Sequence, residues 1–120
     1  MEQSLQDRLR QLLREQARTG DSVTYRDLAQ RLGLTPPGTI RQVAQALESL
    51  MAEDAAAGRP LLAALVVSRK SQQAGRGLPA PGFFTTAQAL GLFAGDPAGA
   101  EAAAFHRREF ERAAVFYGRS

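Results

Sequence analysis

One apolar repeat in the middle of the chain constrains the fold more than any other feature. The repeat consists of six side chains spaced three and four residues apart: Ile40, Val43, Ala44, Leu47, Leu50 and Met51. Residues at these spacings share one face of an α-helix. The repeat therefore predicts a helix over residues 38–56 that packs one face against a core.

Two more helices are predicted ahead of this one. The first, over residues 3–18, carries an apolar stripe formed by Leu5, Leu9, Leu12 and Leu13. Gly20 follows it in the position of a left-handed C-cap. The second is predicted over residues 24–32, with Thr24 as N-cap and Asp27 three residues later as a variant of the capping box.

The segments that follow predict a winged helix-turn-helix. Residues 33–38 contain two prolines and separate the second helix from the third as a turn. Residues 61–68 are predicted to form a strand, although a run this rich in Leu and Ala also suits a buried helix. A second strand over residues 82–85 would return antiparallel, and the basic loop 69–82 would form the wing. The expected fold class is mainly α with a small β-hairpin.

The C-terminal residues predict an added helix. We expect residues 1–95 to form the winged helix-turn-helix and residues 96–120 to contain a helix that packs on it or mediates dimerisation. On a helical projection Phe105 and Phe116 point one way, whereas Phe110 and Tyr117 point about 120–140° away. The first direction predicts a homodimer interface on this helix, which consists of Phe105, Glu109, Arg112 and Phe116.

The composition favours a single cytoplasmic domain. A chain of 120 residues can bury one core. The absence of cysteine excludes disulfides and thiolate catalysis, and a single histidine, His106, cannot form a multi-histidine metal site. No apolar run approaches the roughly 20 residues that span a membrane, and the N-terminus lacks the apolar centre of a secretory signal. We expect no cofactor, no metal site, no catalytic residue and no membrane partner.

The charge distribution suggests an anionic partner. The net charge is only +3, but residues 55–95 contain no acidic side chain, and fourteen of the 15 basic residues are arginine. The arginine fork suits bidentate contacts with phosphate or guanine. A GC-rich genome would produce the same bias toward arginine and alanine.

The predicted third helix and wing supply the candidate DNA contacts. The outward residues in the first two turns of this helix are Thr39, Arg41, Gln42 and Gln45. Arg and Gln match the major-groove edges of guanine and adenine. Arg69, Lys70 and Arg76 would place charge over the flanking phosphates. We therefore expect a non-catalytic protein that binds double-stranded DNA, although an ordinary solvated helix face and a charged mobile loop would look similar.

A sequence motif in this region resembles a known DNA-binding family. Residues 23–29 (Val-Thr-Tyr-Arg-Asp-Leu-Ala) and residues 41–47 (Arg-Gln-Val-Ala-Gln-Ala-Leu) resemble the DNA-binding part of the O6-alkylguanine-DNA alkyltransferases and the alkyltransferase-like proteins. The resemblance implies DNA contacts for Thr24, Tyr25 and Arg26. In that family the tyrosine presses on the backbone and the arginine enters the duplex, which would assign those roles to Tyr25 and Arg41.

The match ends where the family's reactive segment should follow. Pro60 is followed by Leu-Leu-Ala-Ala-Leu-Val-Val, with neither cysteine nor histidine. Alkyl transfer needs a thiolate nucleophile, so that chemistry is excluded. Groove binding by the same scaffold is the expected use, rather than base flipping by Arg41.

A protein-interaction module on a winged-helix scaffold is the alternative, because a fold does not fix a function. The low net charge and the two apolar directions of the last helix favour it. Two remaining polar features are expected to be structural. The adjacent carboxylates Glu53 and Asp54 should lie on a solvated face, and His106 should have a surface or packing role.

Overall fold

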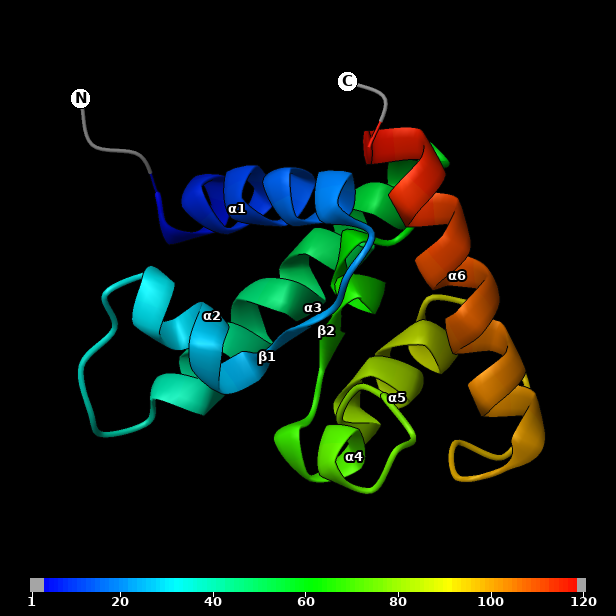
Figure 1. The fold of residues 1–120 in the computed structure, drawn as a ribbon. Coiled ribbons are helices and arrows are strands. Elements are labelled where there is room, and N and C mark those ends of the chain that lie inside the picture. The colour runs from blue at the N-terminus through cyan, green and yellow to red at the C-terminus, as the bar shows by residue number, and fades with distance from the viewer. Residues whose placement is uncertain (1–3, 119–120) are drawn as a thin grey trace.

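The computed structural model describes residues 4–118 and confirms a small, mainly α-helical fold (Figure 1). The helices are α1 (Leu5–Thr19), α2 (Tyr25–Arg31), α3 (Thr39–Ala57), α4 (Arg69–Gln73), α5 (Pro81–Ala89) and α6 (Ala100–Gly118), with one 3-10 helix, η1 (Leu62–Leu65). The predicted segments 1–95 and 96–120 include positions 1–3 and 119–120, which lie outside the described residues.

The first three helices form where the apolar spacing and the caps predict them. Ser4 accepts a hydrogen bond from the Asp7 amide and caps α1, and Gly20 ends that helix with a φ of 75°. Thr24 caps α2 by accepting a hydrogen bond from the Asp27 amide at 3.1 Å. α3 packs against both α1 and α2, so the two helices on either side of the turn share one core.

The expected β-hairpin is wrong. The two strands are β1 (Val23–Thr24) and β2 (Val66–Val67), which pair in parallel with Val23 opposite Val66. Half of the run 61–68 forms η1 instead, with all four η1 side chains buried, and only Val66 and Val67 form a strand. The predicted returning strand 82–85 belongs to α5, because Pro81 suits the first helical turn and Phe83 and Phe84 both face the core.

The expected basic wing is also wrong. Its first residues form α4, because Ser68 caps the helix by accepting a hydrogen bond from the Ser71 amide. The chain then folds back: the Ser68 amide donates to the Leu78 carbonyl at 2.9 Å, and the Leu78 amide donates to Ser71 Oγ at 2.8 Å. These bonds tie the segment against the protein instead of leaving it as a hairpin.

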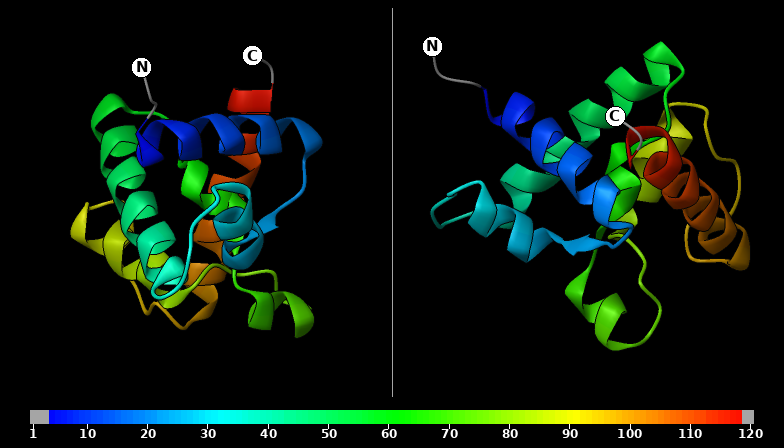
Figure 2. Two further views of the ribbon diagram at one scale, coloured as in Figure 1. Left: turned by 90° about the vertical axis from the view of Figure 1, so that its left-hand side faces the viewer. Right: turned by 45° about the horizontal axis from the view of Figure 1, so that its top comes forward.

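The core lies around η1, which α1, α3 and α6 all contact. Figure 2 shows the green η1 and β2 segment running through the middle of the molecule between these helices. Leu62, Ala64 and Leu65 have no exposed surface. The apolar run that seemed suited to a strand is thus the central packing element, and α6 packs along α1 and η1.

Asp54 corrects the expectation of a solvated carboxylate pair. Glu53 is half-exposed, but the Asp54 side chain is completely buried at the end of α3. The Asp54 carboxylate accepts hydrogen bonds from the Arg10 guanidinium at 2.8 Å, from Arg59 Nε at 3.2 Å and from the Leu62 amide at 3.3 Å. Asp54, near the C-terminal end of α3, therefore links that helix to α1 and to the start of η1.

The predicted dimer face is divided between the core and the surface. Phe105 is buried with its ring centroid 5.2 Å from that of Phe93. Glu109 is also buried, where it accepts a hydrogen bond from the Leu61 amide at 3.4 Å and pairs with Arg112 at 2.5 Å. The inward direction of Phe105 was missed because α5 and the segment after it cover that side of α6. Phe116 remains on the surface.

Candidate nucleic-acid interface

The first turns of α3 present a polar and apolar strip to solvent. Arg41 and Gln45 are exposed and lie one helical turn apart, and Ile40 is 47% exposed beside them. Thr39 and Gln42 are only half-buried rather than fully outward. Gln42 and Gln45 also line a shallow hollow next to Leu5 and Gln6 of α1. Arg41 and Gln45 are therefore the predicted α3 contacts that are most exposed to solvent.

The short parallel sheet brings α2 and α4 together. Thr24 pairs with Val67 at the ends of β1 and β2, and a helix begins directly after each strand. Between the two helices lies a polar hollow of about 360 Å³. Its lining consists of Thr24, Arg26, Asp27, Gln30, Arg69 and Gln72. Arg26 and Arg69, far apart in the sequence, therefore line the same site.

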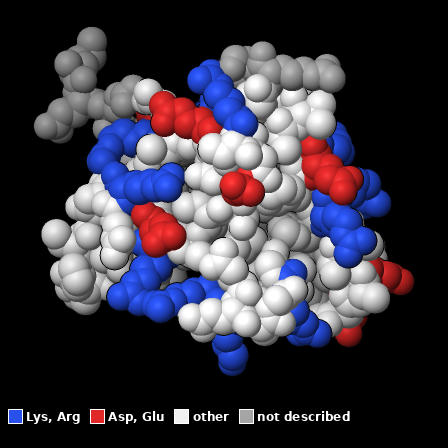
Figure 3. Space-filling view, viewed as in Figure 1, with Lys and Arg blue, Asp and Glu red and all other residues white. Residues whose placement is uncertain are grey.

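Four basic side chains on α2, α3 and α4 have no acidic partner. Arg26, Arg41, Arg69 and Lys70 are exposed, and none of them forms an ion pair within residues 4–118. In Figure 3 blue side chains follow the lower left and the bottom of the face, over α2 and α4. Asp27 supplies a negative charge inside the hollow itself. The four cations and Asp27 together carry a net charge of +3, so the surface that they form is basic.

Two residues predicted from the family resemblance have structural tasks. The Thr24 hydroxyl is buried and occupied by the α2 cap. Tyr25 is also buried, and its hydroxyl accepts a hydrogen bond from the Ala80 amide at 3.0 Å. Burial raises the pKa of Tyr25, and the hydrogen bond from the backbone opposes that rise. Tyr25 therefore fixes the segment after α4 to the start of α2, and we leave it out of the proposed surface.

The structure separates Arg76 from the other predicted wing cations. Arg69 lines the hollow beside α2, whereas Arg76 lines a different hollow beside α6. The sequence analysis placed both arginines on one basic loop and did not predict that α4 would separate them. It also missed Gln30, whose place in the hollow follows from the strand pairing and not from a motif.

These observations define a small mainly α-helical protein with unpaired basic side chains on three neighbouring helices. Comparison of the chain with protein-family models, with curated proteins and with solved structures finds no match. Within the described range, no cluster of three or more His, Asp or Glu side chains is arranged to hold a metal ion. No helix in the same range has the length and apolar character needed to cross a membrane.

Proposed function

We propose that the protein is a non-catalytic, cytoplasmic protein that binds duplex DNA through α2, α3 and α4. In this proposal the first turns of α3 enter the major groove. Arg41 would donate to a guanine edge, and Ile40 would contact a thymine methyl group. Arg26, Arg69 and Lys70 would bind the flanking phosphates.

The observation that carries this proposal is the set of four unpaired cations on adjacent helices. Arg10, Arg59 and Arg112 each pair with a carboxylate, whereas other exposed arginines, such as Arg14 and Arg18 on α1, form no ion pair within residues 4–118. The four cations differ from these in their position together on α2, α3 and α4. Exposed arginines without such partners do little for folding. A phosphate backbone supplies the missing negative charge and releases counterions on binding.

The segment that carries Arg69 and Lys70 is ordered in a way that suits phosphate contacts. The Tyr25–Ala80 hydrogen bond and the Ser68–Leu78 bond hold α4 beside α2. Fixed cations lose less conformational entropy on binding than cations on a mobile loop. The short helix α4 therefore replaces the expected wing as the carrier of these charges.

Replacing one phosphate-binding cation tests the proposal. We expect Arg69→Gln to weaken binding to a random-sequence duplex about tenfold at low salt, close to the value of one hydrogen bond to a charged group. Fluorescence anisotropy with a labelled duplex measures this change. Arg108→Gln, which alters an exposed arginine on α6, is the matched control and should bind like the parent. Equal affinities for all three proteins would contradict the proposal.

Arg41 should act differently from Arg69, because it is assigned to a base edge. We expect Arg41→Ala to reduce discrimination between sequences by about 1–3 kcal/mol at one position of the preferred site. Selection from a random duplex library, followed by sequencing, compares the preferences of parent and variant. An unchanged preference would remove Arg41 from the reading surface.

A second candidate function rests on two exposed apolar side chains near the end of α6. Val115 and Phe116 are 54% and 53% exposed. Such a pair favours self-association or docking of another protein. If it mediates a homodimer, sedimentation velocity at high micromolar concentration should show a dimer that Phe116→Ser dissociates. A monomeric parent at that concentration would argue against this function.

A further inference from the structure

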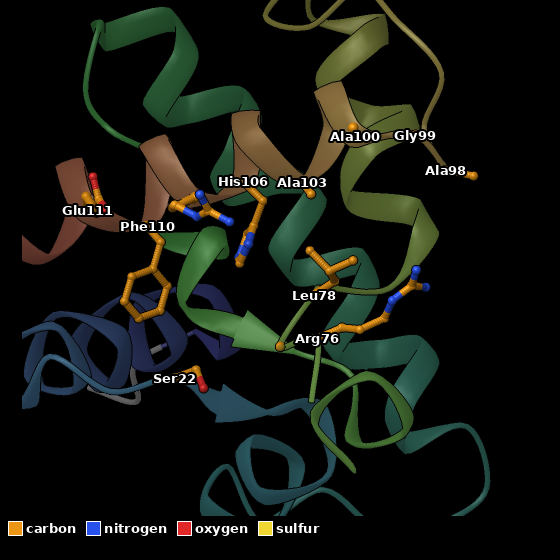
Figure 4. Close-up of a pocket in the computed structure, with 12 residues that line it drawn as sticks. Ser22, Arg76, Leu78, Ala98, Gly99, Ala100, Ala103, His106, Phe110 and Glu111 are labelled. Carbon is orange, nitrogen blue, oxygen red and sulfur yellow. The ribbon is translucent and has the colours of Figure 1, made fainter. Parts of the chain in front are cut away.

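A second hollow lies between α6 and the segment that follows α4, away from the hollow beside α2. Its volume is about 740 Å³, within the usual range of small-molecule sites. Figure 4 shows His106 and Phe110 projecting from α6 toward Leu78 and Ser22, and Arg76 extending away from them beyond Leu78. Elements from three parts of the chain thus line one open hollow.

The charges of this hollow favour an anion. Arg76 and Arg107 both line it, are exposed, and form no ion pair within residues 4–118. Glu111 is the acidic side chain of the lining, and in Figure 4 it points away from the other labelled side chains. Arginine forks in the lining of one hollow suit a carboxylate or a phosphate.

The rest of the lining favours a planar apolar group. Phe110 and Leu78 are both half-buried on the two sides of the hollow. An aromatic ring stacked beside Phe110 would gain more than its buried area alone provides. Gly77 and Gly99 also line the hollow, where they leave room for a ligand to approach the backbone.

His106 supplies a hydrogen-bond acceptor. It is only 6% exposed, and its Nε2 lies 2.8 Å from the Ala64 carbonyl oxygen. A carbonyl oxygen only accepts, so Nε2 carries the hydrogen. Burial lowers the pKa of His106, which keeps the ring neutral and leaves Nδ1 as an acceptor. Nδ1 has no hydrogen-bond partner within the described residues. Every fully buried polar side-chain atom among these residues does have a partner. Nδ1 is therefore not fully buried, and we infer that it is accessible from the hollow that His106 lines.

We propose that this hollow binds a small aromatic organic anion, with its carboxylate or phosphate group on Arg76 and Arg107, its ring against Phe110, and a hydroxyl or amino group donating to His106. The site uses neither Arg26 nor Arg69. It therefore stands or falls separately from duplex binding.

Two pairs of probes test the site on the full chain. The pairs are 4-hydroxybenzoate with uncharged 4-hydroxybenzyl alcohol, and AMP with uncharged adenosine. We expect at least one anion to shift the amide NMR signals of Gly77, Gly99 and Ala103 in a saturable way, about tenfold more tightly than its uncharged partner. The pair that responds distinguishes a carboxylate ligand from a nucleotide.

Variants locate the binding. Arg107→Gln should weaken the bound anion about tenfold, and Phe110→Ala should weaken it as well. Arg69→Gln should leave it unchanged. Arg69 and Arg107 are both exposed, so their replacement should preserve the fold. Amide spectra recorded without a probe should therefore match those of the parent. The proposal is overturned if neither anion saturates at millimolar concentration, or if Arg69→Gln removes binding while Arg107→Gln does not.

Discussion

Asp54 shows how one buried charge organises this protein. Its carboxylate accepts from Arg10 of α1, and from Arg59 and the Leu62 amide in the segment after α3. Removing one partner of a buried ion pair typically costs about 3–5 kcal/mol, because the remaining charge is left without compensation. We therefore expect Asp54→Asn to lower the free energy of unfolding by about 3 kcal/mol in urea denaturation.

Glu53 provides the control for this prediction. Its side chain is half-exposed and pairs with Arg10 at 2.9 Å. Exposed ion pairs contribute about 0–1 kcal/mol, so Glu53→Gln should change stability little. If both variants lose the same small amount, the Asp54 network does not have the structural importance assigned to it.

His106 predicts a pH dependence of stability. Burial lowers its pKa from 6.5 in the folded state, against the opposing effect of its bond to Ala64. The unfolded chain then binds a proton more readily than the folded one, so stability should be complete above about pH 6.5 and should fall as the pH drops below it. Urea denaturation between pH 7.5 and 5.5 should show this loss. In His106→Gln the loss should be smaller over the same range.

At the scale of elements, the end of α2 depends on one backbone conformation. Gly33 has a φ of 70°, and its amide and that of Leu34 close the helix by bonding to Gln30 and Ala29. A side chain is strained at this φ by about 1–2 kcal/mol. We expect Gly33→Ala to destabilise the protein by about 1 kcal/mol in thermal or urea unfolding.

Gly82 is the matched control for Gly33. It lies in α5, and a Cβ there would meet Glu48 Oε1 at 3.9 Å, an ordinary contact distance. Ala is preferred over Gly in a helix by about 1 kcal/mol. Gly82→Ala should therefore leave stability unchanged or raise it. A loss equal to that of Gly33→Ala would show that the left-handed backbone is not the cause.

The helices with long apolar stripes and local caps were the elements that the sequence predicted well. In α1, α2 and α3 the information is local: Ser4, Thr24 and Gly20 act within a few residues of the helices that they limit. The strand pairing was missed because β1 and β2 contribute only two residues each and meet across about forty residues of chain. No periodicity develops in so short a strand.

In the candidate site, too, local features were predictable from the sequence and tertiary ones were not. The sequence placed Arg41 on the outer face of α3, and the structure leaves it exposed. It could not show that Arg69 would lie beside Arg26 while Arg76 would line another hollow, because that separation depends on α4 and its fold-back onto Ser71. Tyr25 was predicted as a DNA contact from its motif, and only the tertiary bond to Ala80 reveals its packing role.

At the scale of the whole molecule, unpaired cations line two separate hollows among the described residues. One lies between α2 and α4 and the other between α6 and the segment after α4. The core around η1 connects them, and the segment from Ser68 to Ala80 contributes to both. This arrangement allows duplex binding and small-anion binding to be measured separately.

Salt dependence tests the central claim most directly. If Arg26, Arg69 and Lys70 each neutralise a phosphate, the logarithm of the duplex association constant should fall with the logarithm of salt concentration with a slope of about −3. The double variant Arg26→Gln/Arg69→Gln should reduce that slope by about two units. A parent slope near zero, or a slope that the double variant leaves unchanged, would contradict duplex binding by this surface.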